Sequence, residues 1–161
     1  FTWSHASIMF NVMEQVPGVA KLVSVGLRDF GRRELEYLRA RPERIHPFFD
    51  AALARRLEDG EAWSRILDDI VAPLPREVYL SFDIDGLEPS LCPHTGTPVP
   101  GGLTFAQAVS LLRRVHETGR RVVGFDLSEV APDPEGRSEW DANVGMRLLY
   151  KLIGYAKRSR A

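Results

Sequence analysis

Residues 78–89 read VYLSFDIDGLEP, and this stretch decides the fold class. Its first five residues are mostly apolar and β-prone, which is typical of a strand covered on both faces. Asp83 and Asp85 stand two positions apart, so in a strand their side chains point to the same side. Two carboxylates held this close repel each other and are costly to desolvate unless a cation lies between them. The pair therefore predicts part of a site for a hard divalent metal, built from oxygen ligands.

Strands and helices alternate along the rest of the chain. Short apolar runs predict strands at 22–27, 45–49, 78–84 and 122–127. Periodicity and capping signals predict helices at 4–15, 33–41, 104–119 and 138–157, with one or two more within 51–71. The alternation is typical of an α/β fold with three layers, in which helices sandwich a parallel sheet. Such sheets gather active sites at the carboxyl ends of their strands, so the loops after Leu27, Ile84 and Leu127 should share one edge.

Two further features concern packing and loops. The last helix places five large apolar side chains on one predicted buried face: Val144, Leu148, Leu149, Leu152 and Ile153. The Gly- and Pro-rich loop over residues 86–102 is long for a compact domain, which favours a functional loop.

The bulk composition sets limits on the function. At 161 residues the chain is long enough for one domain with a sizeable core. Its net charge of -1 gives no reason to expect nucleic acid or an anionic membrane as a partner. The single cysteine, Cys92, excludes an internal disulfide and fits a reducing cytoplasm. The chain begins at Phe1 without a methionine, from which we expect a fragment, a processed chain or a trimmed chain.

Residues 81–103 closely resemble the third metal motif of the ureohydrolases, the family of arginase, agmatinase and formimidoylglutamase. The family pattern is S-F-D-[IV]-D-x-x-[DE]-P, followed by G-T-G-T-P-x-x-G-G-L. This chain departs from it clearly only at His94-Thr95, ahead of Gly96-Thr97-Pro98. The resemblance implies an arginase-like, three-layer α/β/α fold. It covers residues 1–161 only as the C-terminal part of a single ureohydrolase domain.

The resemblance implies a metal centre with two manganese ions. Asp83 and Asp85 match aspartates that ligate this cluster in the family, and Asp83 would bridge both ions. The ions lower the pKa of a water molecule, and the resulting hydroxide attacks a guanidinium carbon to release urea and an amine. Manganese is implied by the family, and nickel or cobalt could occupy similar sites.

Three more residues resemble family positions that act on the substrate. Glu129, in the segment DLSEVAP at 126–132, matches a glutamate that pairs with the guanidinium, a planar cation suited to two-pronged recognition. Thr97 matches a threonine beside that group, although it could equally be a turn hydroxyl. His5 matches a histidine that shuttles a proton to the leaving amine, with a helix-capping role as the alternative. Surface or packing roles are expected for the remaining histidines: His46, His94 and His116.

The family's other metal motifs, G-G-D-H and D-A-H-x-D, do not occur in these 161 residues. Asp83 and Asp85 alone can form only a partial site, because each ion takes about six ligands. We therefore expect this chain by itself to be inactive or nearly so, and the site to be complete only with the upstream ligands. The family commonly forms trimers or hexamers, which implies a homo-oligomer for the whole protein.

The substrate implied by the resemblance is a small guanidino or formimino compound, cleaved to urea or formamide and an amine. The Ser4-His5 context is nearer to agmatinases than to arginases, which favours a guanidino compound without the arginine carboxylate.

Two other classes of protein could carry part of this pattern. Phosphatases of the haloacid-dehalogenase type also run an apolar strand into D-x-D-G, but they need a later lysine. The only later lysines here, Lys151 and Lys157, lie in the predicted terminal helix. The second alternative is a shortened, ureohydrolase-derived subunit without catalysis.

Overall fold

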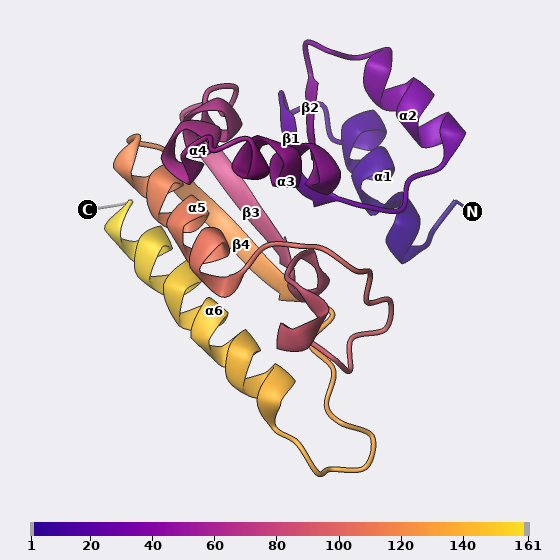
Figure 1. Cartoon of the computed structure of the whole chain (residues 1–161). Coiled ribbons are helices and arrows are strands. Elements are labelled where there is room, and N and C mark those ends of the chain that lie inside the picture. Colours follow the sequence, from indigo (N-terminus) through magenta and orange to yellow (C-terminus); the bar gives the residue numbers. More distant parts are fainter. Residues whose placement is uncertain (1, 160–161) are drawn as a thin grey trace.

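The computed structural model describes residues 2–159, in which helices and strands alternate (Figure 1). The strands are β1 (Leu22–Leu27), β2 (Ile45–Phe49), β3 (Glu77–Asp83) and β4 (Arg121–Ser128). The α-helices are α1 (Ile8–Gln15), α2 (Arg32–Arg39), α3 (Asp50–Glu58), α4 (Trp63–Val71), α5 (Phe105–Glu117) and α6 (Trp140–Arg158). Short 3₁₀ helices cover His5–Ser7, Ile84–Gly86 and Pro89–Leu91. The predicted α/β class is confirmed, with element ends shifted by a few residues.

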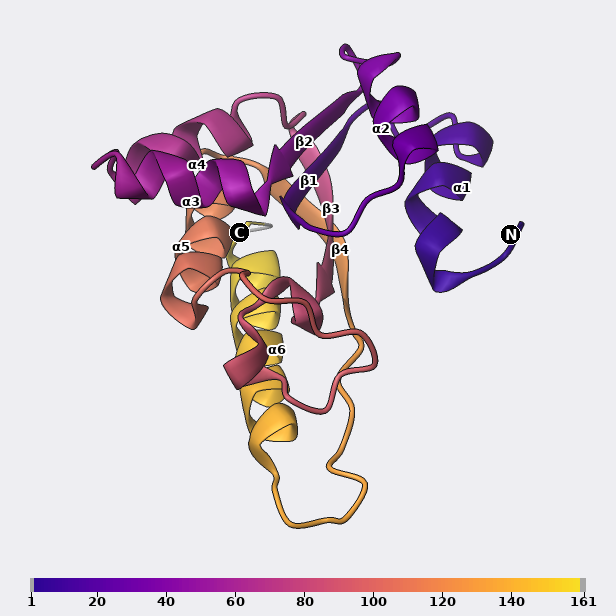
Figure 2. The same cartoon turned by 45° about the vertical axis from the view of Figure 1, so that its right-hand side comes forward.

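The strands pair as two parallel ladders, although one sheet was predicted. β1 pairs with β2, from Leu22 opposite Ile45 onward, and β3 pairs with β4. Figure 2 shows the first pair inclined to the second. The two pairs meet at their ends, because β1 contacts the turn that follows β3. A Cβ atom added at Gly26 would lie 3.7 Å from the carbonyl oxygen of Gly86.

The β1–β2 pair has helices on both faces, as the three-layer prediction requires. On one face, Met13 of α1 and Leu38 of α2 pack with Ile45 in a buried cluster. On the other face, Leu53 of α3 joins residues of α4 in a second cluster that includes Val23 and Val25. This part of the fold is held by apolar burial from both sides of the strands.

The β3–β4 pair is covered on one face only among the described residues. Val78 is buried with Val115 of α5 and Ala156 of α6, so these helices lie on that face. The alternate residues of β3 point the other way, and Tyr79 is 60% exposed. The prediction that this strand is covered on both faces is therefore wrong for residues 2–159.

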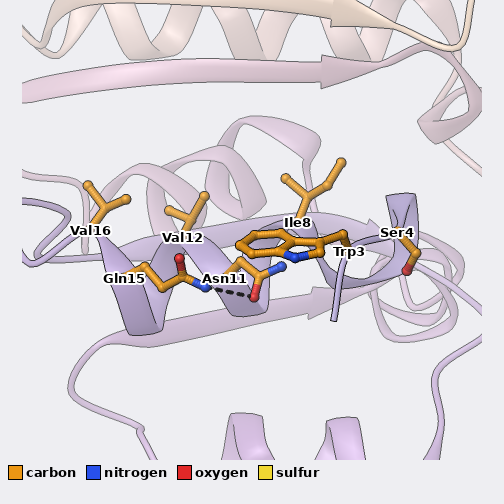
Figure 3. Close-up of a pocket in the computed structure, with 7 residues that line it drawn as sticks. All are labelled: Trp3, Ser4, Ile8, Asn11, Val12, Gln15 and Val16. Carbon is orange, nitrogen blue, oxygen red and sulfur yellow. Dashed lines mark hydrogen bonds between the residues drawn. The ribbon is translucent and has the colours of Figure 1, made fainter. Parts of the chain in front are cut away.

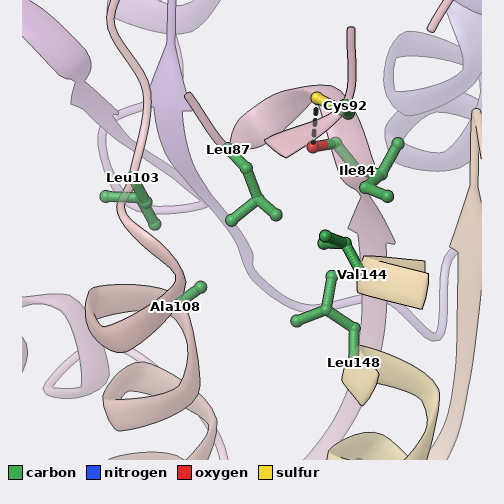
Figure 4. Close-up of a cluster of buried hydrophobic side chains, with 7 residues drawn as sticks. All are labelled: Ile84, Leu87, Cys92, Leu103, Ala108, Val144 and Leu148. Atoms are coloured by element: carbon green, nitrogen blue, oxygen red, sulfur yellow. Dashed lines mark hydrogen bonds between the residues drawn. The ribbon is translucent and has the colours of Figure 1, made fainter. Parts of the chain in front are cut away.

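A buried cluster anchors the turn after β3 to the helices. It brings together residues of the turn, of the following loop, of α5 and of α6: Ile84, Leu87, Cys92, Leu103, Ala108, Val144 and Leu148 (Figure 4). Ile84 is fully buried, and its carbonyl oxygen accepts a hydrogen bond from the Cys92 thiol at 3.4 Å. The apolar core therefore fixes the backbone on which Asp83 and Asp85 stand.

The buried face of α6 is narrower than the sequence predicts. Val144, Leu148 and Leu152 are buried, whereas Leu149 and Ile153 are 39% and 42% exposed. Val144, Leu148 and Leu152 are four residues apart and therefore lie along one side of the helix. Leu149 and Ile153 each follow a buried residue by one position, which turns them about 100° around the helix axis. Despite these apolar residues, neither α6 nor any other helix between residues 2 and 159 combines the length and the hydropathy needed to cross a membrane.

The contrast between buried Leu148 and half-exposed Leu149 makes a pair of matched substitutions informative. Leu148→Ala should lower the free energy of unfolding by about 2–5 kcal/mol, because it leaves a cavity in the cluster around Ile84. Leu149→Ala removes the same atoms from a half-exposed position and should cost about 1 kcal/mol or less. Denaturant titration followed by circular dichroism measures both values. Equal losses for the two variants would contradict the orientation of α6.

Candidate metal centre

Asp83 and Asp85 lie on either side of a strand end. β3 stops at Asp83, and Ile84–Gly86 form one 3₁₀ turn. The Asp85 backbone N–H donates to Asp83 Oδ1 at 3.1 Å, so Asp83 caps this turn. The strand predicted over 78–84 thus ends one residue earlier, at Asp83. The turn still directs both carboxylates away from the core, because Ile84 between them is fully buried.

The two carboxylates are short of positive charge. The pKa of Asp83 is raised to about 6, first by desolvation and then by the charge and hydrogen bonding of Asp85. The charge of Glu129 adds to this rise, while the Asp85 backbone N–H acts in the opposite direction. Adjacent carboxylates that disfavour each other's ionisation are a setting in which a bound cation is stabilising.

Thr97 and Glu129 lie beside this pair. The Thr97 hydroxyl donates to Asp85 Oδ2 at 3.3 Å. The register of the β3–β4 ladder places Asp83 opposite Ser128, so Glu129 follows directly at the same strand end. Its carboxylate borders the Thr97 loop, since a Cβ atom added at Gly96 would lie 3.7 Å from Glu129 Oε2. The structure thus brings four predicted site residues together at one edge.

The backbone of Glu129 is held in an uncommon conformation. Its φ angle is +62°, in the left-handed region that residues other than glycine seldom adopt. The hydroxyl of Thr95, which is buried, donates to the Glu129 carbonyl oxygen at 3.0 Å. Strain of this kind persists where surrounding contacts impose it, and it clusters at functional sites. Sequence reasoning gave Thr95 no role, although its place directly ahead of Gly96-Thr97-Pro98 was a signal.

Arg28 is a second residue that the sequence analysis missed. It follows β1 and donates from Nη2 to the carbonyl oxygen of Asp85. Its Nε and Nη1 atoms are buried without a hydrogen-bond partner among the described residues. Gly101 and Gly102 pass close to it with φ angles of +96° and +98°, where a Cβ atom would collide with its neighbours. Arg28 thus joins the loop after β1 to the loop after β3. Because β3 and β4 end together, the loop after β4 lies at the same edge, as predicted.

His5 stands apart from the other candidates. It is exposed in the 3₁₀ helix before α1, and no hydrogen bond or ion pair joins it to Asp83, Asp85 or Glu129. A groove beside it on α1 is lined mostly by apolar residues: Trp3, Ser4, Ile8, Asn11, Val12, Gln15 and Val16 (Figure 3). None of the site carboxylates lines this groove.

Asp83 and Asp85 are the right type of ligand for a divalent metal, but two ligands are too few to complete its coordination. Carboxylate oxygens are the ligands that Mn²⁺ and Mg²⁺ favour, and the pKa of Asp83 is raised first by desolvation and then by the neighbouring carboxylates of Asp85 and Glu129. Between residues 2 and 159, however, no group of three or more His, Cys, Asp or Glu side chains is placed to hold an ion. The chain therefore offers part of a metal site.

The sequence model of the arginase family matches residues 1–154. The chain belongs to the arginase family. An N(1)-aminopropylagmatine ureohydrolase from Thermus thermophilus is 37% identical to it over 154 residues, or 94% of this chain and 46% of that protein. Hepatic arginase from Aquarana catesbeiana is 32% identical over 139 residues, or 84% and 42% of the two chains. The solved structure of proclavaminate amidino hydrolase from Streptomyces clavuligerus has a TM-score of 0.74 and 27% identity, over 94% and 48%.

These comparisons confirm the predicted ureohydrolase family and the arginase-like fold class. They decide against the phosphatase alternative, because the family match extends over nearly the whole chain. The chain spans about half the length of the curated relatives it matches.

The raised pKa of Asp83 predicts a pH-dependent loss of stability in the metal-free chain. A carboxyl whose pKa is higher in the folded state stabilises the fold below its unfolded pKa, and this contribution is lost as the pH rises. Asp83→Asn should therefore become more stable relative to the unsubstituted chain as the pH rises from about 4 to 6.

The measurement is denaturant unfolding in EDTA at several pH values. Asp59→Asn, which alters an exposed aspartate just after α3, serves as the matched control for the loss of one carboxylate. Parallel curves for the unsubstituted chain and Asp83→Asn would show that the pKa of Asp83 is not raised.

Proposed function

We propose that this chain supplies part of the catalytic centre of a ureohydrolase that cleaves a guanidino or formimino compound. The products would be urea or formamide and an amine. One observation carries the proposal: in a chain of the arginase family, Asp83, Asp85, Thr97 and Glu129 lie together beyond the ends of β3 and β4. Hydrolysis of the C–N bond would take place at this edge of the strands.

Glu129 is the proposed partner of the substrate cation. A guanidinium group presents parallel N–H donors that match the two oxygens of one carboxylate. The Thr95 hydroxyl holds the Glu129 backbone in its left-handed conformation, so the carboxylate is fixed before the substrate arrives. Such preorganisation lowers the cost of orienting the substrate.

Thr97 is the proposed second contact to the guanidinium. Its hydroxyl proton is directed to Asp85 Oδ2, so the lone pairs of its oxygen remain free to accept a substrate N–H. This arrangement links the substrate position to the carboxylate pair. His5 is our candidate for protonating the leaving amine, since imidazole exchanges protons near neutral pH.

Asp83 and Asp85 would contribute carboxylate ligands to a centre of two Mn²⁺ ions. The ions would lower the pKa of a water molecule and thereby supply a nucleophile at neutral pH. The remaining ligands would come from the G-G-D-H and D-A-H-x-D motifs, which these residues lack. We therefore propose that residues 1–161 alone are inactive and that the enzyme is the longer protein containing both motifs.

The agmatinase-like substrate class rests on two supports. The Ser4-His5 context is nearer to agmatinases, and a relative that is 37% identical is named as an aminopropylagmatine ureohydrolase. The proposed surroundings are a homo-oligomer, as a trimer or hexamer, in the cytoplasm. The lone cysteine, Cys92, agrees with a reducing compartment, since the chain can form no internal disulfide.

The activity test uses a protein that joins these residues to the two upstream motifs. With Mn²⁺, it should release urea from agmatine with a kcat/KM about tenfold or more above that for arginine. Glu129→Gln should lower kcat/KM about 10- to 100-fold, because it removes a charged hydrogen-bond acceptor from the guanidinium. Glu135→Gln changes an exposed glutamate paired with Arg137 and should leave kcat/KM unaltered. Urea release that Glu129→Gln leaves unchanged would contradict the assigned role.

The metal test uses the 161-residue chain itself. After dialysis against Mn²⁺ and removal of loosely held metal, we expect less than one ion per chain, because two carboxylates are too few ligands. Asp83→Asn should weaken the remaining binding further, as measured by titration calorimetry. Two tightly held ions per chain would mean that the site is already complete, which would overturn the proposal of a partial centre.

A further inference from the structure

His94 joins the Thr97 loop to the start of α6. Its ring Nδ1 lies 2.7 Å from Asp141 Oδ2, and its backbone N–H donates to Asp141 Oδ1 at 3.0 Å. An ionised carboxylate only accepts hydrogen bonds, so with Asp141 in that form Nδ1–H is the donor of this pair. Asp141 is 2% exposed, and His94 contacts both of its carboxylate oxygens. The prediction of a surface or packing role for His94 is therefore incomplete.

A second carboxylate faces the other side of the imidazole. Asp133 Oδ1 lies 3.7 Å from His94 Nε2. The backbone N–H groups of Glu135 and Arg137 donate to the Asp133 carboxylate at 2.9 and 3.0 Å. These hydrogen bonds, that of Glu135 first, hold the pKa of Asp133 below its ordinary value. The ring therefore lies between two anionic groups, one from α6 and one from the loop after β4.

The residues that follow His94 contact the proposed site. Thr95 donates to the Glu129 carbonyl oxygen, and Thr97 donates to Asp85. Four consecutive residues, 94–97, thus connect α6, the backbone of Glu129 and the carboxylate pair. A shift of His94 would pass to both threonines, because only Gly96 separates them and no regular element supports the segment.

We infer that His94 is a positioning residue for the guanidinium site, holding Thr97 and Glu129 in place through its bond to Asp141. This inference rests on the proposed function and extends it to a residue remote from the reacting atoms. His94 stands at the position where this chain departs from the ureohydrolase pattern given above. The His94–Asp141 contact would fix the conformation of residues 94–97, and His94 itself would not touch the substrate.

The test compares His94→Gly with His94→Asn in the protein that joins these residues to the upstream motifs. Glycine removes the ring, whereas the Asn side-chain amide can donate to Asp141 from nearly the position of Nδ1. His94→Gly should lower kcat/KM for the guanidino substrate about 10- to 100-fold, mainly through KM, because the guanidinium contacts lose their alignment. His94→Asn should restore kcat/KM to within about threefold of the unsubstituted enzyme.

Hydrogen exchange supplies a readout that needs no activity. Amides of residues 94–97 should exchange about fivefold or more faster in His94→Gly and at the ordinary rate in His94→Asn. Amides of β3 and β4 should exchange equally in all three proteins. Faster exchange of the loop with an unchanged KM would reduce His94 to a stabilising residue and overturn the inference.

Unchanged exchange in His94→Gly would also overturn it. An unsubstituted protein that releases no urea would contradict the proposed function, and the exchange rates would then decide whether His94 fixes the loop.

Discussion

The repulsion between Asp83 and Asp85 is the constraint around which the rest of the structure is arranged. The two carboxylates cannot turn inward, because Ile84 between them fills the core beneath α6. They are held in place by neutral and positive groups from elsewhere: the Thr97 hydroxyl and the Arg28 guanidinium at the Asp85 carbonyl. The buried Ile84 side chain and the polar contacts to Asp85 together hold the two carboxylates at the end of β3. That is the arrangement expected where a cation is to be bound.

Parallel pairing of β3 and β4 explains why the other half of the candidate site arrives at the same place. In parallel strands the carboxyl ends coincide, and the ladder sets Asp83 opposite Ser128. Glu129 is the first residue beyond that register, and Thr95 fixes its backbone in the left-handed region. The β3–β4 ladder therefore places the proposed metal ligands, Asp83 and Asp85, beside Glu129, the proposed partner of the planar cation. The Thr95 hydroxyl contacts the backbone of Glu129 at that position.

The sequence predicts the local features well and the distant contacts poorly. Apolar runs and the capping signal of the helix predicted at 104–119 depend on near neighbours. The structure confirms them, with Thr104 and Gln107 forming a capping box. The rotation that exposes Leu149 depends on how α6 packs against α5 and β4, which periodicity alone cannot fix. The bond between His94 and Asp141 spans 47 positions, and neither residue belongs to a motif that signals the other. Long-range pairs of this kind become visible only once the loops are placed.

The negative charges of Asp83, Asp85 and Glu129 link the stability of the chain to its proposed function. Ionising Asp83 beside Asp85 and Glu129 opposes folding at neutral pH, and the exposed side of β3 leaves this pair facing outward. Any group that binds the folded carboxylates and not the unfolded chain stabilises the fold by its own binding free energy. A divalent ion, together with the side chains that complete its coordination, would do so while creating the catalytic centre. Completion of the site and stabilisation of this part of the fold would then be one thermodynamic event.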